Sequence, residues 1–220
     1  MRLRSMLFAP ASHERHAAKA LSGEAGADAV ILDLEDAVRV EDKAAARARI
    51  RSLLTGRAGG PPAWVRINGM TTEFAYEDLV AVVGQGLAGI VLPKVESGTE
   101  VATADWLVGH LEGLTGLPRG TVALMPSVET AKGLIAVPTL ASLPRARQIM
   151  FGALDFSLDV GSTPAAGREG LLWARSQLAI ACRAAGLLPP IDTVYPDLQN
   201  EAGIAEEAAQ ARRLGFGGKA

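Results

Sequence analysis

Residues 29–36 read Ala-Val-Ile-Leu-Asp-Leu-Glu-Asp, an unbroken apolar run that ends in acidic residues. A strand exposed to solvent on one face alternates polar and apolar residues, whereas a strand buried on both faces is continuously apolar. We therefore predict a fully buried strand over Ala29–Leu34, within a parallel sheet that helices cover on both sides.

A short apolar strand followed by a helical segment recurs along the chain. Short runs rich in Val and Ile alternate with Ala-, Glu- and Arg-rich segments typical of helices. Parallel strands need crossover connections, and seven such units at roughly thirty-residue spacing favour a (β/α)8 TIM barrel over an open sheet. We predict that residues 1–220 form one α/β domain of this kind. The predicted strands are Leu3–Ala9, Ala29–Leu34, Ala63–Asn68, Gly89–Val95, Val122–Ser127, Gln148–Gly152 and Pro190–Val194, and the predicted helices include Lys43–Leu54, Ala165–Ala185 and Glu201–Leu214.

The predicted barrel is incomplete at its C-terminal end. An eighth strand would begin near Gly217, but the sequence ends at Ala220. A parallel barrel without its last strand leaves two unpaired strand edges. We therefore expect an open seam, with the C-terminal strand and helix missing.

Composition excludes several classes of function. The 220 residues are 49% hydrophobic and carry a net charge of −2, so no basic excess favours binding to nucleic acid. Cys182 is the single cysteine, and His13, His16 and His110 lack metal-ligand partners at useful spacing. No apolar run is long enough for a membrane span, and no signal peptide is evident, so we expect a cytoplasmic protein without a membrane partner.

The predicted strand Ala29–Leu34 ends in a group of acidic residues. In a TIM barrel the active site gathers at the C-terminal ends of the strands, where Asp33, Glu35 and Asp36 fall. Alternation places Asp33 and Glu35 on one face, with Asp36 on the other face or in the loop. Carboxylates buried together need a cation or hydrogen-bond donors, which indicates a functional cluster. The alternative is that Asp36 only caps the following segment.

Basic residues end the next two predicted strands. Arg66 lies within Val65–Asn68, where its planar guanidinium matches a carboxylate of a substrate. The alternative for Arg66 is a structural ion pair with the acids of the preceding strand. Lys94 follows the next strand and suits either a Schiff base or the neutralisation of a carboxylate, of which we favour neutralisation.

One acid follows each of the next two strands. Glu129 comes just past the predicted strand Val122–Ser127, and Asp155 comes just past the predicted strand Gln148–Gly152. Magnesium prefers oxygen ligands and keeps several of its waters. Two carboxylates from neighbouring strand ends, facing an arginine, therefore predict a Mg2+ site.

These segments, taken in order, resemble the citrate lyase beta subunit and malyl-CoA lyase family of the HpcH/HpaI aldolase superfamily. The similarity extends from residue 4 to the last residue and includes a match of Leu214–Lys219 to a motif near the family's C-terminus. The other matching segments are Arg4–Pro10, Ala29–Val38 (AVILDLEDAV), Val65–Asn68 (VRIN), Val91–Glu96 (VLPKVE), Val128–Gly133 (VETAKG) and Phe151–Phe156 (FGALDF).

The resemblance implies a role for each candidate residue. It identifies Glu129 and Asp155 as Mg2+ ligands, and Glu35 and Asp36 as catalytic acids that act next to the metal through its waters. It makes Arg66 a catalytic and substrate-binding residue. The substrate is expected to contact Arg66 and Glu129, and also Phe8 and Lys19.

Two departures from the family pattern affect these expectations. His13 stands where relatives often carry Arg, which weakens the case for binding the phosphates of coenzyme A. The family's Cys-Ile-His-Pro motif, expected just after Lys219, is absent together with a segment that often completes the site of a neighbouring subunit. The resemblance also implies a homotrimer or a multiple of it.

The function implied is a magnesium-dependent carbon–carbon lyase. Its substrate would be a 3-hydroxyacyl-CoA thioester, such as malyl-CoA, citramalyl-CoA or citryl-CoA, cleaved to an acyl-CoA and a 2-oxo acid. Two alternatives remain open. One is a metal-dependent 2-oxo-acid aldolase that acts on free acids, and the other is a citrate lyase beta subunit that needs an acyl-carrier partner.

Overall fold

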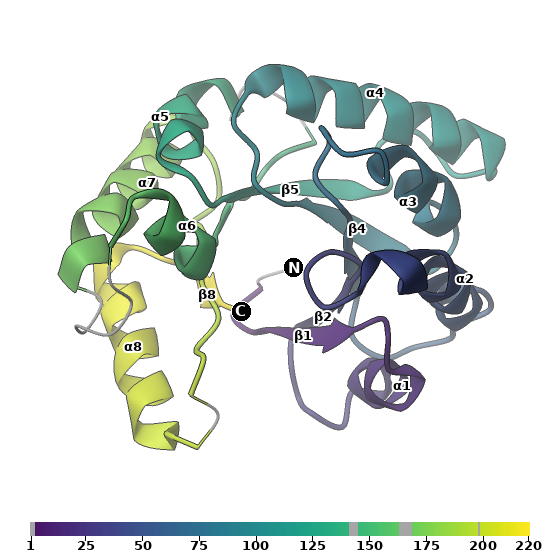
Figure 1. Ribbon diagram of the computed structural model, residues 1–220, viewed down its shortest axis with the longest axis horizontal. Helices are drawn as coiled ribbons and strands as arrows, with labels where there is room; N and C mark the ends of the chain where they lie inside the picture. The colour runs from purple at the N-terminus through teal and green to yellow at the C-terminus, as the bar shows by residue number, and fades with distance from the viewer. Residues whose placement is uncertain (1–2, 141–144, 163–168, 198) are drawn as a thin grey trace.

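Eight parallel strands form a single sheet in which each strand pairs with the next one along the chain (Figure 1). The computed structural model describes residues 3–140, 145–162, 169–197 and 199–220. The predicted TIM barrel is therefore confirmed. The strands are β1 (Met6–Pro10), β2 (Ala29–Asp33), β3 (Ala63–Arg66), β4 (Leu87–Leu92), β5 (Ala123–Val128), β6 (Met150–Phe151), β7 (Ile191–Asp192) and β8 (Gly218–Lys219).

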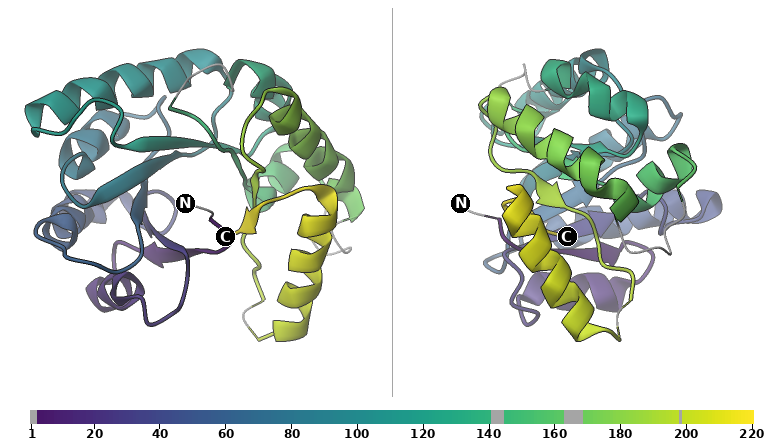
Figure 2. Two further views of the ribbon diagram at one scale, coloured as in Figure 1. Left: turned by 180° about the vertical axis from the view of Figure 1, so that it is seen from behind. Right: turned by 90° about the vertical axis from the view of Figure 1, so that its left-hand side faces the viewer.

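Helices surround the ring of strands, as the views from behind and from the side show (Figure 2). The bounds of α2 and α8 agree with the prediction, whereas the predicted helix Ala165–Ala185 begins only at Leu172, and residues 165–168 lie outside the described residues. The helices are α1 (Glu14–Ser22), α2 (Lys43–Leu54), α3 (Ala75–Val82), α4 (Gly98–Leu114), α5 (Ala131–Leu140), α6 (Ala153–Asp159), α7 (Leu172–Ala184) and α8 (Glu201–Leu214), with 3-10 turns η1 (Val40–Asp42) and η2 (Glu169–Leu171).

Alternate residues of each strand face two different cores. In β2, Val30 and Leu32 pack in the large core with residues of the helices, whereas Ala29 and Ile31 belong to the smaller core inside the barrel. Because side chains alternate along a strand, Asp33 follows Ile31 into the barrel interior. The same alternation turns the last residue of β3 inward, so polar strand ends converge on one mouth of the barrel.

Trp64 fills the interior below that mouth. Its indole lies in the inner core, and a Cβ placed on Gly89 of the neighbouring strand would approach the indole ring to 2.3 Å. Only glycine at this position leaves room for the ring. The packed inner core closes the barrel below its mouth, so a site at the mouth has a solid base of buried side chains.

The expectation of an open seam is corrected. Gly218 and Lys219 form β8 beside β7, and the backbone N–H of Lys219 donates to the carbonyl of Arg4 at 2.9 Å. A bridge between Ser5 and Lys219 joins β8 to the start of the chain, so the ring is nearly closed. β8 matches its partner β7 in length, since each strand has two residues.

A buried ion-pair network holds this closing strand. The ammonium of Lys219 donates to the carbonyl of Thr193 at 2.7 Å and to Asp192 at 3.3 Å, and it pairs with Glu207 of α8. Asp192 also receives two hydrogen bonds from Arg175 of α7, and all of these side chains are buried. The network thus ties the last two strands to the last two helices.

Replacing Lys219→Met should therefore weaken the barrel at its seam. The change leaves Glu207 buried beside an apolar chain, and breaking such a pair costs about 3 kcal/mol of unfolding free energy. Lys132→Met is the matched control, because Lys132 pairs with Glu96 on the surface and such pairs contribute less than about 1 kcal/mol. Urea unfolding followed by circular dichroism measures both, and equal losses in the two variants would contradict the role of Lys219.

Candidate active site

The mouth of the barrel is organised by an arginine and an aspartate on adjacent strands. Asp33 and Arg66 are register partners at the ends of β2 and β3. The Nε and Nη2 groups of Arg66 each donate to one carboxylate oxygen of Asp33 at 2.7 Å. Two of the five N–H groups of the guanidinium are used in this way. The ion pair considered as the alternative for Arg66 is thus present, and other donors of the same group still face the site.

The turn after β2 adds two further acids to this pair. Nη1 of Arg66 lies 3.0 Å from Glu35 and 3.5 Å from Asp36. Burial would lower the pKa of Arg66, but the hydrogen bonds and the charge of Asp33, together with Glu35 and Asp36, outweigh it and raise the pKa. Glu35 is buried and Asp36 is largely exposed. Asp36 therefore contacts basic residues of the site, rather than capping the helix that follows.

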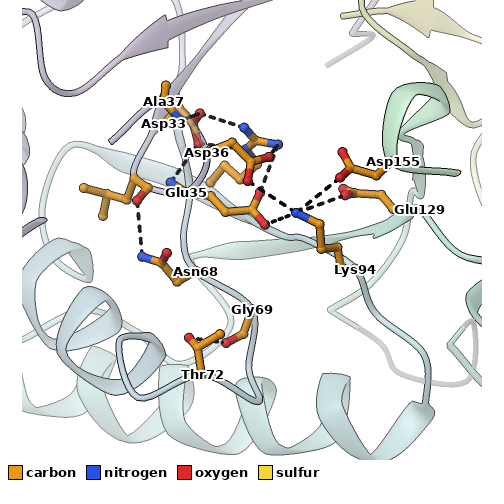
Figure 3. A network of polar contacts seen from close by, with 12 residues as sticks. Asp33, Glu35, Asp36, Ala37, Asn68, Gly69, Thr72, Lys94, Glu129 and Asp155 are labelled. Carbon is orange, nitrogen blue, oxygen red and sulfur yellow. Dashed lines mark hydrogen bonds and ion pairs between the residues drawn. The ribbon is translucent and has the colours of Figure 1, made fainter. Parts of the chain in front are cut away.

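Lys94 lies at the centre of four carboxylates (Figure 3). Its ammonium is 2.6 Å from Glu35, 3.4 Å from Asp36, 3.5 Å from Asp155 and 4.0 Å from Glu129. Burial would lower the pKa of Lys94, but the hydrogen bond and the charge of Glu35, with the other acids, raise it overall. A lysine held protonated in this way neutralises carboxylates, which agrees with the role that the sequence favoured over a Schiff base.

Glu129 is buried with one oxygen unpartnered. The side chain lies just beyond β5 at 2% exposure, and its Oε2 has no hydrogen-bond partner among the described residues. A Cβ on Gly152 would come within 2.5 Å of the Glu129 Cγ, so glycine makes the space that the carboxylate occupies. Burial raises the pKa of Glu129 to about 7, although Ser127, Arg66 and Lys94 act in the opposite direction.

Asp155 lies in the first turn of α6, which begins directly after β6. The sequence placed it just past a strand, and the structure adds that the strand ends at Phe151, one residue earlier than predicted, and that a helix presents the side chain. Asp155 and Glu129 lie next to each other on one side of the Lys94 ammonium, 3.5 and 4.0 Å from its nitrogen (Figure 3). A cation between them would satisfy the unpartnered oxygen of Glu129.

A cavity of about 320 Å³ opens over these groups. Its walls include Phe8, Asp36, Arg66, Glu129 and Asp155, all of which are predicted site residues. The guanidinium of Arg66 lies over the Phe8 ring, 5.1 Å from its centroid. The structure thus brings the predicted acids, the arginine and the phenylalanine together at one site, with Glu35 joined to it through Lys94.

Lys19 is the predicted residue that lies elsewhere. It is exposed on α1 and lines a separate surface hollow with Arg15, Arg49 and the two histidines of that helix end. A substrate long enough to extend from the barrel mouth to α1 would be needed for Lys19 to contact it. Its role stays a prediction.

A second layer of buried polar residues, which the sequence analysis missed, supports the acidic turn. The ammonium of Lys43 donates to the carbonyls of Leu34 and Glu35 at 2.9 and 3.1 Å and to the Asn68 side chain at 2.7 Å. Asn68 donates in turn to the buried carboxylate of Asp78. A lysine in the first turn of a helix gave no sign of this role, because two of its partners are backbone carbonyls, which residue type does not mark, and the third is the side chain of Asn68 on another segment.

The donor set suits a hard divalent cation with open coordination positions. Within the described ranges, no group of three or more His, Cys, Asp or Glu side chains is placed to hold a metal by itself. Glu129 and Asp155 offer two carboxylates beside an open cavity, and Mg2+ commonly takes one or two carboxylates and completes its shell with water or substrate. The residues present therefore fit Mg2+.

Among the described residues, no helix is both long enough and apolar enough to cross a bilayer.

Known proteins resemble the chain over nearly its whole length. The citrate lyase subunit beta of Leuconostoc mesenteroides subsp. cremoris is 35% identical over 98% of this chain and 71% of its own length. The (3S)-malyl-CoA thioesterase of Cereibacter sphaeroides is also 35% identical, with the same coverage of both chains. The crystal structure of protein CitE from Mycobacterium tuberculosis in complex with magnesium, acetoacetate and coenzyme A superposes with a TM-score of 0.80, at 31% identity, covering 99% of this chain and 75% of that one.

A model of one protein family matches residues 4–220. Together with relatives above 30% identity, this match confirms the resemblance seen in the sequence and the lyase class it implied. The chain belongs to the HpcH/HpaI aldolase/citrate lyase family.

Proposed function

We propose that the protein is a magnesium-dependent carbon–carbon lyase that cleaves a 3-hydroxyacyl-CoA thioester, such as malyl-CoA, citramalyl-CoA or citryl-CoA. The observation that carries the proposal is the single cavity lined by Arg66, Glu129 and Asp155, with the unpartnered oxygen of Glu129 beside it. Relatives named for citrate lyase and for malyl-CoA, and a related structure with magnesium and coenzyme A, support this class of substrate.

The reaction breaks the bond between the carbinol carbon and the carbon next to the thioester. The hydroxyl loses its proton and becomes the carbonyl of a 2-oxo acid, while the electron pair of the broken bond forms the enolate of the acyl thioester. That enolate takes a proton and leaves as acyl-CoA. Mg2+ held by Glu129 and Asp155 would supply Lewis-acid stabilisation of the oxygen that becomes the carbonyl.

The chain's own residues orient the substrate and balance its charge. Arg66 has donors that Asp33 does not use, and these would bind the carboxylate of the 2-hydroxy-acid end. Phe8 packs against the guanidinium and would keep water from that side of the pair. Glu35 and Asp36, held by Arg66 and Lys94, would hydrogen-bond the waters around the metal.

The substrate class is tested by assaying the purified protein with three forms of the same acid: the coenzyme A thioester, the free acid and the acyl-carrier conjugate. Cleavage of free coenzyme A thioesters by the purified protein supports the proposal. Cleavage of free 2-hydroxy acids alone would instead indicate the 2-oxo-acid aldolase, and activity only with an acyl-carrier conjugate would indicate a citrate lyase beta subunit.

Substitution of the proposed ligands tests the site itself. Glu129→Ala and Asp155→Ala should each lower kcat/KM on the cleaved thioester by at least about 100-fold, because each removes a stabiliser of developing charge. Glu96→Ala is a matched control, since Glu96 follows β4 but pairs with Lys132 rather than with the cavity groups. Retention of full activity by both ligand variants would rule out the assignment.

The space beside Glu129 provides a second test. Gly152→Ala should weaken Mg2+ binding by at least about tenfold, because the new methyl group would lie 2.5 Å from the Glu129 Cγ and would displace the carboxylate that this carbon carries. The control is Gly113→Ala in α4, where an added Cβ meets nothing within 4 Å. Calorimetric titration with MgCl2 measures both, and wild-type affinity in Gly152→Ala would show that the packing does not position Glu129.

The raised pKa of Glu129 predicts a pH-dependent stability in the absence of metal. The folded protein holds a proton on Glu129 between the ordinary pKa of 4.5 and its folded value of about 7, whereas the unfolded chain has released it. Stability therefore falls as pH rises through that window. Glu129→Gln lacks this term, so from pH 5 to pH 8 it should gain roughly 3 kcal/mol relative to wild type in EDTA.

Urea unfolding at the two pH values measures this difference. Added Mg2+ at pH 8 should stabilise the wild type and leave Glu129→Gln unchanged, because only the wild type offers the carboxylate. Parallel pH profiles of the two proteins would contradict the assigned pKa.

A further inference from the structure

We propose that Lys94 is a positioning residue that divides the acids of the site into two pairs and limits how tightly Glu129 and Asp155 bind a divalent cation. This inference rests on the metal site of the proposed function. It assigns to Lys94 a role apart from contact with substrate, as a counter-ion fixed to the chain.

The geometry separates the acids on either side of one ammonium (Figure 3). Glu35 and Asp36, both from the turn after β2, lie 2.6 and 3.4 Å from the Lys94 nitrogen. Asp155 and Glu129, which follow β6 and β5, lie 3.5 and 4.0 Å away on the other side. The ammonium is therefore closest to the first pair and only loosely engaged with the second.

The backbone of Lys94 adopts a left-handed conformation at this position. Its φ of 51° is the one positive value found at a non-glycine residue among those described. A left-handed conformation is unfavourable for a residue with a Cβ, and such residues cluster at functional sites. A hydrogen bond from the N–H of Val95 to the carbonyl of Ser127 at 3.2 Å fixes the chain directly after this residue.

The position of the ammonium implies opposite effects on two equilibria. Without a divalent ion, Lys94 offsets repulsion among the four acids and stabilises the folded site. A divalent ion on Glu129 and Asp155 would lie close to the same ammonium and be repelled by it. Removing the positive charge should therefore destabilise the metal-free protein and at the same time strengthen metal binding.

The test is titration of the metal-free protein with MgCl2 at pH 8 by calorimetry, with unfolding in EDTA as a second readout. Lys94→Met keeps the length of the side chain and removes the charge, and we expect its Kd for Mg2+ to fall at least about tenfold. Its urea midpoint in EDTA should fall below that of the wild type. Lys94→Gly also removes the charge but relieves the left-handed backbone, so it should fold and show the same tighter binding.

Two controls separate charge at this position from charge in general. Lys132→Met makes the same change of net charge at an exposed lysine outside the acid cluster, and its Mg2+ affinity should match the wild type. Lys94→Arg retains the positive charge and should bind Mg2+ within about threefold of the wild type. A lysine with a purely structural role would give the opposite sign, because its loss would weaken metal binding.

The outcomes distinguish this inference from the proposed function. Unchanged or weaker Mg2+ binding in both Lys94→Met and Lys94→Gly, with wild-type binding that Glu129→Gln abolishes, would overturn the inference and leave the metal site intact. Failure of the wild type and of every Lys94 variant to bind Mg2+ would overturn both. Tighter binding in the two neutral variants, abolished again by adding Glu129→Gln, supports both.

Discussion

Charge at the barrel mouth is anchored by the bidentate pair between Arg66 and Asp33. These residues are direct register partners, so the parallel pairing of β2 and β3 places a guanidinium beside a carboxylate without any loop. The positive charge then lowers the cost of burying Glu35, together with Lys94 on the other oxygen of that carboxylate. A barrel with a neutral residue at position 66 would have to expel or protonate these acids. The positions of Glu35 and Asp36 thus depend on this pair, because it fixes the guanidinium that both acids contact.

A second constraint fixes the turn that carries the acids. The ammonium of Lys43 binds the backbone carbonyls of Leu34 and Glu35. The side chains of Glu35 and Asp36 instead pair with Lys94 in the site. The backbone and the side chains of the turn are thus held by different groups. A change in the charge of the cavity can alter the side chains without releasing the backbone, which is the preorganisation that an active site needs.

Prediction from sequence succeeded where the signal was local. The Ala-, Glu- and Arg-rich composition predicted the bounds of Lys43–Leu54 and Glu201–Leu214 to the residue, and the polar strand ends predicted that the acids and Arg66 lie together at one mouth of the barrel, as they do. It failed where the signal was not local. Pairing of Lys219 with both neighbouring strands closed a seam that the sequence predicted to be open, because strand pairing across the whole chain is invisible in a short terminal run. The central place of Lys94 likewise depends on a left-handed backbone that residue type does not reveal.

The positions of Arg66 and Lys94 explain why a divalent ion would bind at Glu129 and Asp155 rather than at Glu35. Both oxygens of Glu35 already face a cation, Lys94 at 2.6 Å and Arg66 at 3.0 Å. Glu129 is even more buried than Glu35, yet its nearest cation among the described residues is 4.0 Å away. Glu129 and its neighbour Asp155, which lies 3.5 Å from Lys94, are therefore neutralised less closely by fixed cations than Glu35 is. A divalent ion gains most where burial has raised the energy of a carboxylate and no fixed cation has yet lowered it.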